Sequence, residues 1–172
     1  MLPHLQKKKI LNLILAKVCD TGWNKESIQV AAEQSKFSFD EVMTDFDNDI
    51  GEIVKFFNRC VDEEMVSGLR RGVKKKHSIR GQIKKAILLR LRILSRNKKA
   101  FKNTMAYLSF PQNLTLSLDL LYSTADSIWR SIGDKSTDFN FYTKRILLSG
   151  IYLPTLLFWI EDQSDGFRDT SA

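Results

Sequence analysis

Apolar residues recur along this chain at intervals of three and four, the spacing that places side chains on one face of an α-helix. In the first such segment, the repeating apolar positions are Ile10, Leu11, Ile14, Leu15 and Val18. Helical spacing, capping residues and breaks at glycine and proline together predict helices over residues 5–19, 25–34, 39–47, 50–69, 78–95, 98–108, 114–132 and 138–162. The predicted fold class is therefore all-α.

The last predicted helix, for which Ser136 or Thr137 is the expected cap, is the most apolar part of the chain. It has no charged residue from Ile146 to Ile160, a run of fifteen residues that Gly150 and Pro154 interrupt. A membrane-spanning helix needs about 20 apolar residues, so we expect no span here. A helix without a polar face must contact a core, a partner subunit or an apolar ligand. We expect this helix to be buried on nearly every side.

Composition agrees with a folded helical protein. The chain has 172 residues, of which 43% are apolar, with only eight Gly and three Pro, enough for one large domain or two small ones. Cys19 and Cys60 are far apart, and the simplest interpretation is two reduced thiols in an intracellular protein. His4 and His77 have no cysteine or carboxylate at ligand spacing, so the sequence predicts no metal site.

Charge is distributed unevenly along the chain. The segment from Arg70 to Lys102 contains six Arg, eight Lys and no acid, whereas the rest of the chain has a net charge of −7. Such a segment is typical of a surface that meets a membrane, nucleic acid or an acidic partner. Equally, it can be a solvated face that pairs with acids elsewhere in the fold. Nucleic acid is disfavoured, because Phe101 is the only aromatic residue available to stack on bases.

The first three predicted helices are short, and a tight turn over residues 35–38 joins the second to the third. This is the arrangement of a helix-turn-helix. Longer helices that could form a dimerising bundle follow, so the chain resembles the tetracycline-repressor (TetR) class of transcription factors. We predict a degenerate helix-turn-helix head over residues 1–49 and a larger C-terminal helical domain over residues 50–172.

The helix in the recognition position is unsuited to DNA. A recognition helix needs basic or neutral polar side chains, because it enters a groove walled with phosphates. Residues 39–49 instead contain five acids and no base, and residues 24–49 have a local charge of −5. We therefore expect the motif to be retained as a scaffold only.

The predicted helix over residues 78–95 has an apolar arc and a basic side. At about 100° per residue, the arc contains Ile79, Ile83, Ala86, Ile87, Leu91 and Leu94. Arg90 falls inside the arc, and one interpretation is a core helix in which Arg90 pairs with a buried acid, Asp119 or Asp126. The other is a helix whose basic side meets anionic lipid heads, each exposed base contributing about 1 kcal/mol. The two roles can coexist on different faces.

No set of residues in the sequence predicts catalysis. The chain has no recognisable nucleophile–base pair, Gly-rich phosphate loop or Cys/His cluster. Asp119 and Asp126 lie on one helical face, but without a histidine they make no convincing metal or acid–base site. The acidic run at residues 62–64 is expected to be solvated. We predict neither an enzyme nor a bound cofactor.

Several stretches in the second half of the chain carry a family signature. They read FPQN at residues 110–113, TADSIW at 124–129, GDKSTDF at 133–139, YTKR at 142–145 and EDQS at 161–164. Together they resemble the coenzyme Q (ubiquinone) biosynthesis family of lipid-binding accessory proteins, that of the ninth Coq protein, whose members share the TetR-like fold. The resemblance is specific over about residues 108–170.

The resemblance implies a function. Members bind isoprenoid lipids at the membrane surface and present the quinone precursor to the di-iron demethoxyubiquinone hydroxylase, without being enzymes themselves. Residues 50–172 would then be the domain for lipid binding and dimerisation. The lipid-binding residues that we predict are Leu120, Leu121, Trp129, Leu147, Leu148, Ile151, Tyr152 and Phe158. For each of them the competing interpretation is ordinary core packing.

A partner-binding site is also implied, at the start of the last helix. Asp138, Phe141, Tyr142, Lys144 and Arg145 match the family pattern, with Phe141 at a position where many members have Trp. We expect Phe141 and Tyr142 to lie in an exposed patch that contacts the hydroxylase. The alternative is that both rings pack against the first turn of a core helix.

The resemblance implies further partners and a location. We expect peripheral contact with an anionic membrane surface and a homodimer, but no binding to DNA. No transit segment rich in Arg and Ser is visible, which favours a cytoplasmic protein peripheral to the inner membrane of a bacterium, or the mitochondrial matrix side in a eukaryote. The alternative function is a TetR-type transcriptional regulator that responds to a ligand.

Overall fold

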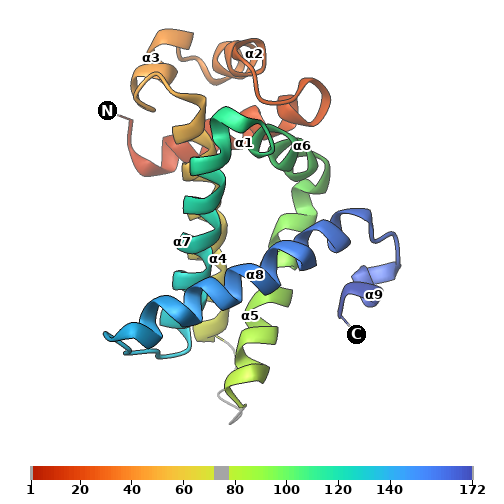
Figure 1. Ribbon diagram of the computed structural model, residues 1–172. Coiled ribbons are helices and arrows are strands. Elements are labelled where there is room, and N and C mark those ends of the chain that lie inside the picture. Colours follow the sequence, from red (N-terminus) through yellow and green to blue (C-terminus); the bar gives the residue numbers. More distant parts are fainter. Residues whose placement is uncertain (1, 72–77, 172) are drawn as a thin grey trace. The chain divides into compact units, whose positions relative to one another are not determined.

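The computed structural model describes residues 2–71 and 78–171, and helices make up nearly all of this part of the chain (Figure 1). The chain divides into two compact units. Unit 1 comprises Met1–Cys60 and Asn97–Ser117, and unit 2 comprises Val61–Arg96 and Leu118–Ala172. The all-α fold class is confirmed, since the described residues contain no strand. The division of roles predicted at residues 49 and 50 stays a prediction, because the units reflect compactness alone.

Unit 1 is built from short helices around α1. Its helices are α1 (His4–Thr21), α2 (Lys25–Ser35), α3 (Phe39–Thr44), the first part of α4 (Ile50–Arg71), α6 (Lys98–Leu108) and the start of α7 (Leu114–Ser131). α1 packs against α2 and α6, and α2 packs against α3. The buried side chains of α1 are Ile10, Leu11, Ile14, Leu15 and Val18. They are the positions that the apolar pattern predicted.

Capping side chains set the starts of α2 and α3. Asn24 caps α2 as predicted, and its side chain accepts a hydrogen bond from a backbone N–H of the first turn at 2.8 Å. Ser38 and Glu41 form a capping box at the start of α3. Helix α3 ends at Thr44, earlier than predicted, and the chain turns away through Asp47, which has a left-handed φ of 52°.

The acids of the head contribute to the fold of unit 1. α3, at the place of a recognition helix, carries Asp40 and Glu41 but no base. Asp45 follows it; its carboxylate accepts a hydrogen bond from the backbone N–H of Leu2 at 2.7 Å and lies 3.4 Å from the ammonium of Lys7. This part of unit 1 is acidic where a DNA-binding protein would carry bases for the phosphates.

Unit 2 consists of longer helices. Its elements are the second part of α4, α5 (Ile79–Leu94), most of α7, α8 (Phe139–Glu161), a 3₁₀ turn (Asp165–Phe167) and α9 (Arg168–Ser171). α5 contacts α8 directly, and Figure 1 shows the two helices crossing. The observed helix boundaries agree with the predicted ones to within a few residues, except that α9 was not predicted.

Helix α8 has a different cap from the predicted one. Asp138 occupies the N-cap position, and its carboxylate accepts a hydrogen bond from the backbone N–H of Asn140 at 3.1 Å. The prediction that Ser136 or Thr137 caps this helix was therefore wrong. A carboxylate at this end also interacts favourably with the helix dipole. Within residues 2–71 and 78–171, no helix combines the length and apolarity needed to cross a bilayer.

Candidate functional site

A buried cluster of polar side chains, which we term the Arg90 network, joins the helices of unit 2. Its members are Arg90 of α5, Asp62 of α4, Thr124 of α7 and Tyr152 of α8. Arg90 is 1% exposed, and its Nε donates a hydrogen bond to Asp62 at 2.7 Å. Its terminal nitrogens donate to the hydroxyls of Thr124, at 3.2 Å, and of Tyr152. The ion pair joins α5 to α4, and the hydrogen bonds of Arg90 to Thr124 and Tyr152 join α5 to α7 and α8.

The Arg90 network confirms one expectation and corrects two. Arg90 pairs with a buried acid, as its place in the apolar arc predicted. The acid is Asp62, so the two candidates named from the sequence, Asp119 and Asp126, were wrong. Asp62 is only 5% exposed, so the expectation that residues 62–64 are solvated was also wrong for this residue. A buried carboxylate needs an opposite charge and hydrogen bonds, and Arg90 supplies both.

Tyr152, a predicted lipid-binding residue, belongs to this network. It is 1% exposed. Burial raises the pKa of its phenol to about 12, although the charge of Arg90 acts in the opposite direction. The hydroxyl therefore stays protonated near neutral pH, and its observed part is to accept a hydrogen bond from Arg90.

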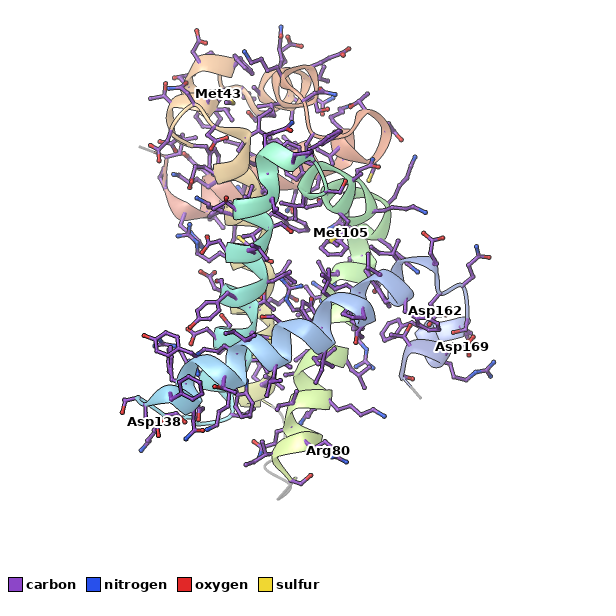
Figure 2. The ribbon with its side chains drawn as sticks, in the orientation of Figure 1. Met43, Arg80, Met105, Asp138, Asp162 and Asp169 are labelled. Carbon is purple, nitrogen blue, oxygen red and sulfur yellow. The ribbon has the colours of Figure 1, made fainter. Side chains whose placement is uncertain are left out.

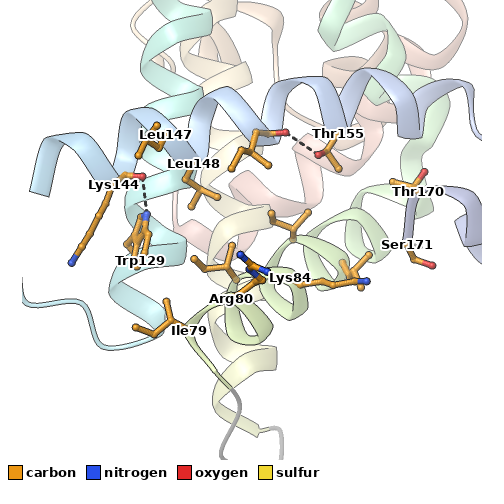
Figure 3. Close-up of a pocket in the computed structure, with 14 residues that line it drawn as sticks. Ile79, Arg80, Lys84, Trp129, Lys144, Leu147, Leu148, Thr155, Thr170 and Ser171 are labelled. Atoms are coloured by element: carbon orange, nitrogen blue, oxygen red, sulfur yellow. Dashed lines mark hydrogen bonds between the residues drawn. The ribbon is translucent and has the colours of Figure 1, made fainter. Parts of the chain in front are cut away.

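Unit 2 also contains a groove between helices, which we term the α5–α8 groove (Figure 3). Its volume is about 600 Å³, within the range of about 300–1,000 Å³ typical of small-molecule sites. The lining residues are Ile79, Arg80, Ile83, Lys84, Ile87, Leu88, Trp129, Lys144, Leu147, Leu148, Ile151, Thr155, Thr170 and Ser171. They come from α5, α7, α8 and α9.

The lining of the α5–α8 groove is apolar along the walls and polar in places. Figure 3 shows Trp129 at one end and Thr170 at the other. The Trp129 indole donates a hydrogen bond to the backbone carbonyl of Lys144 at 3.0 Å, which fixes the ring. Arg80 and Lys84 add positive charge from α5, and no lining residue is acidic. The groove suits a molecule with an apolar tail and a polar or anionic head.

The structure brings half of the predicted lipid-binding residues to this groove. Those that line it are Trp129, Leu147, Leu148 and Ile151. Leu120 is buried, Leu121 is half-buried and Phe158 is exposed, but these three do not line the groove, nor does Tyr152. Whether lipid touches any of them remains a prediction.

Sequence reasoning missed the wall that α5 supplies. Ile79, Ile83 and Ile87 were placed in the apolar arc, but the arc was assigned to the core. Only part of that arc is core: Leu91 is fully buried, whereas Ile79 is 62% exposed. The available signal was the arc itself, because its spacing identifies an apolar face but does not show where the helix that covers it stops.

Helix α8 is less buried than expected. One face packs inward through Leu148, Leu156 and Trp159. The large apolar side chains of α8 that are more than half exposed are Phe139, Tyr142, Ile146, Leu147, Ile151, Leu157 and Phe158. The core of this chain therefore covers only one face of α8, and contact of the other faces with a partner subunit or an apolar ligand stays a prediction. An exposed apolar surface of this size is typical of a binding or subunit interface.

Signature residues of α7, of the loop that follows it and of the first turns of α8 form an ionic cluster, which we term the α7–α8 clamp. Arg145 donates hydrogen bonds to Asp126 at 2.7 Å and to Asp134 at 3.1 Å. Lys144 donates to Asp134 at 2.8 Å and to Ser136 at 2.6 Å. The hydrogen bond from Lys144 is the largest of the effects that hold the pKa of Asp134 well below its usual range.

The α7–α8 clamp determines what the predicted partner-binding residues can contact. Arg145 is 1% exposed, and its guanidinium carbon lies 3.5 Å from the centroid of the Phe141 ring. The Phe141 and Tyr142 rings meet edge to face at 5.1 Å between centroids. Tyr142 is 58% exposed. Arg145 thus reaches no surface itself and instead supports Phe141, beside the exposed Tyr142, while Asp138 caps the helix.

The basic segment is partly internal and partly paired. Residues 72–77, which include three of its lysines and His77, lie outside the described residues. Arg90 is buried, and Lys99 and Arg96 form exposed ion pairs, the first with Asp20 at 2.8 Å. The described part of the chain contains no group of three or more His, Cys, Asp or Glu that could hold a metal ion.

Comparison with known proteins adds a family to this geometry. Residues 114–172 match the family model COQ9. The "Ubiquinone biosynthesis protein COQ9, mitochondrial" of Rattus norvegicus is 34% identical over 169 residues, which cover 94% of this chain and 54% of the rat protein. The Homo sapiens protein of the same name is 32% identical over 94% of this chain and 53% of its own length. The chain spans about half the length of these curated relatives.

A solved structure matches the fold. The crystal structure of a TetR transcriptional regulator from Nitrosomonas europaea has a TM-score of 0.73 and covers 96% of this chain and 91% of its own. The two sequences are 18% identical, so the match concerns the fold alone, and it confirms the TetR-like fold predicted from the head. Residues 114–172 of this chain therefore match the COQ9 family, most of the chain is similar to curated COQ9 proteins, and its fold is TetR-like.

Proposed function

We propose that this chain acts in ubiquinone biosynthesis as an accessory protein that binds an isoprenoid quinone precursor. The observation that carries the proposal is the α5–α8 groove, a largely apolar groove of about 600 Å³ in a chain whose residues 114–172 match the COQ9 family. Each CH₂ group of a prenyl tail that is buried in the groove contributes about 0.8 kcal/mol to the binding free energy. The proposed ligand lays its tail along the α5 and α8 walls, with its head near the basic or hydroxyl-bearing residues.

The proposed chemical partner is the di-iron demethoxyubiquinone hydroxylase, to which this chain would present the precursor. The proposed contact surface is the start of α8, where Phe139 is 82% exposed and Tyr142 is 58% exposed. The α7–α8 clamp holds Phe141 and the helix end in place beneath these rings. Catalysis would belong to the hydroxylase, so the chain itself is proposed to be a carrier and not an enzyme.

We propose further that the chain forms a homodimer and meets an anionic membrane peripherally. The exposed apolar side chains of α8 that do not line the groove, among them Ile146 and Leu157, favour a second copy as their cover. The exposed bases of α5, such as Arg80 and Lys85, favour contact with anionic heads. The relatives are named as mitochondrial proteins, so we favour that compartment. They lend no support to the bacterial location.

A paired substitution on α8 tests the proposal. Leu147→Gln with Ile151→Gln adds polar groups to the groove wall, where both side chains are more than half exposed, so folding should be retained. We expect co-purified isoprenoid lipid, identified by mass spectrometry after solvent extraction, to fall about tenfold or more, since burying an unpaired amide costs about 1–3 kcal/mol. The matched control is Leu5→Gln with Leu114→Gln, which changes similarly exposed apolar side chains of unit 1 outside the groove.

The alternative of a ligand-responsive repressor has the fold in its favour and the charge of the head against it. We expect no salt-sensitive binding of the 172-residue chain to duplex DNA at low salt. Tight binding that charge reversal within residues 39–49 abolishes would overturn the proposed function. An absence of extractable lipid from the wild-type chain would do so as well.

A further inference from the structure

The signature segment at residues 161–164 has no role in the function proposed above, yet its Asp162 is the centre of a dense set of hydrogen bonds. Asp162 is 9% exposed. Its Oδ1 accepts from the backbone N–H of Ser164 at 2.8 Å and from the Ser164 hydroxyl at 2.5 Å. Its Oδ2 accepts from the backbone N–H of Thr170 at 2.8 Å and from the Thr170 hydroxyl. Each carboxylate oxygen therefore accepts hydrogen bonds from at least two donors.

These bonds fold residues 163–171, which we term the terminal turn, back onto the end of α8. The Ser164 hydroxyl also accepts a hydrogen bond from the backbone N–H of Asp169 at 3.0 Å. Figure 2 shows Asp162 and Asp169 close together at one end of α8. The hydrogen bonds from Ser164 and Thr170 lower the pKa of Asp162, so the carboxylate is ionised at neutral pH and its hydrogen bonds are of the strong, charge-assisted kind.

The terminal turn also forms one end of the α5–α8 groove. Thr170 and Ser171 line the groove together with Thr155 of α8. Figure 3 shows Thr170 and Ser171 at the end opposite Trp129. Thr170 therefore both lines the groove and donates hydrogen bonds to Asp162. Asp162 itself does not line the groove, so it can act on a ligand only through the terminal turn.

We propose that Asp162 is a positioning residue that holds the terminal turn as the end wall of the α5–α8 groove, and that release of this turn lets an apolar tail enter and leave. This inference rests on the proposed function, because it presumes that the groove takes such a ligand. Segments with few contacts open locally at much less cost than the whole fold, so the hydrogen bonds to one carboxylate can set how often this wall opens.

The test measures how fast a bound tail escapes. The probe is farnesol carrying a nitrobenzoxadiazole fluorophore, and its release is followed by stopped-flow fluorescence after addition of excess unlabelled farnesol. Asp162→Asn keeps the shape of the side chain, but its amide nitrogen cannot accept hydrogen bonds from one of the two donor pairs. We expect release to be about tenfold faster, the equivalent of one charge-assisted hydrogen bond. Amide exchange at Thr170 should also speed up, with no change in the middle of α8.

Two further variants separate positioning from general destabilisation. Asp165→Asn changes an exposed acid of the same turn and should leave release unchanged. Ser164→Ala removes one hydroxyl donor from Asp162 and the acceptor of the Asp169 N–H, without changing a residue that lines the groove, and it should speed release by a few-fold. Combined with Asp162→Asn, it should add less than its separate effect, because both changes act on one set of bonds.

The outcomes distinguish this inference from the function on which it rests. If the wild-type chain does not retain the probe, the proposed function fails. If the wild-type chain retains the probe and Asp162→Asn speeds amide exchange at Thr170 without speeding probe release, the role of the terminal turn in ligand exit is refuted. The proposed function would then still stand. Equal acceleration by Asp165→Asn would also refute the role assigned to Asp162.

Discussion

Units 1 and 2 are both helical, but they differ in what they bury. The buried polar side chains of unit 1 are Ser27 and Thr104, which carry no charge. Those of unit 2 are Asp62, Arg90, Thr124, Arg145 and Asp162. A buried charge lowers stability unless it is paired and hydrogen-bonded. Unit 2 therefore depends on specific polar partners, whereas unit 1 depends mainly on apolar packing.

The two units also differ in what they expose. In unit 1 the exposed large apolar side chains are Leu5, Phe110 and Leu114. In unit 2 they are Ile79, Leu118, Phe139, Tyr142, Ile146, Leu147, Ile151, Leu157 and Phe158. Unit 2 thus buries several charged side chains beside its apolar core and leaves many large apolar side chains exposed to solvent. The difference favours our proposal that unit 1 is a scaffold and that unit 2 holds the binding surfaces.

Arg90 is the residue of unit 2 at which a substitution should lower the free energy of unfolding most. Arg90→Met removes the guanidinium and leaves Asp62 buried without its ion-pair partner. We expect a loss of about 3–5 kcal/mol in the free energy of unfolding, the usual cost of breaking a buried pair from one side. Urea unfolding followed by circular dichroism measures it.

A matched control for Arg90 lies on the same helix. Arg92 is exposed, and Arg92→Met should change the free energy of unfolding by less than about 0.5 kcal/mol. Adding Asp62→Leu to Arg90→Met removes the stranded charge and should recover most of the loss. If the single and double variants are equally unstable, the ion pair is not what unit 2 depends on.

The helices themselves could be predicted from the sequence, because each is fixed by neighbours in the chain. Asn24 caps α2 through a hydrogen bond within one turn, and the apolar pattern of α1 selects its buried face. The position of Arg90 inside an apolar arc was enough to predict a buried ion pair. Local spacing and capping residues were therefore enough to predict the fold class and most helix ends.

The partners across helices could not be predicted in the same way. Asp62 pairs with Arg90 across 28 positions of the chain, and no local rule distinguishes it from the other acids. Ile79 and Ile83 show the same problem, because spacing reveals an apolar arc but not where its covering helix stops. A groove forms where the apolar faces of two helices do not pack against each other. Its position depends on how the helices cross, which neither sequence segment specifies alone.

Thr104 offers a smaller test, in unit 1. Its hydroxyl accepts a hydrogen bond from the Trp23 indole at 2.9 Å and donates to the carbonyl of Ala100 at 2.9 Å. Thr104→Val keeps the shape but leaves the indole N–H buried without this acceptor, so we expect a loss of about 2 kcal/mol. Thr143→Val, at a half-buried position of α8, removes only a local bond to a backbone carbonyl and should have a much smaller effect. A loss at Thr104 as large as that at Arg90 would contradict the contrast between the units.

Asp134 provides the smallest effect and the one that depends on pH. Its folded pKa is depressed, first of all by the hydrogen bond from Lys144. Its contribution to stability is therefore complete above the unfolded pKa of about 3.9 and is lost as the pH falls below that value. Asp134→Asn should lower the free energy of unfolding by about 1 kcal/mol at neutral pH, since the amide oxygen still accepts a hydrogen bond.

Thermal unfolding between about pH 5 and pH 2 measures the pH dependence. The stability of Asp134→Asn should fall less steeply with acid than that of the wild type, whereas the stability of Asp165→Asn should parallel that of the wild type. Parallel curves for all three proteins would show that the α7–α8 clamp does not draw its strength from an ionised Asp134, and unit 2 would then depend on charge at the Arg90 network more than at its surface.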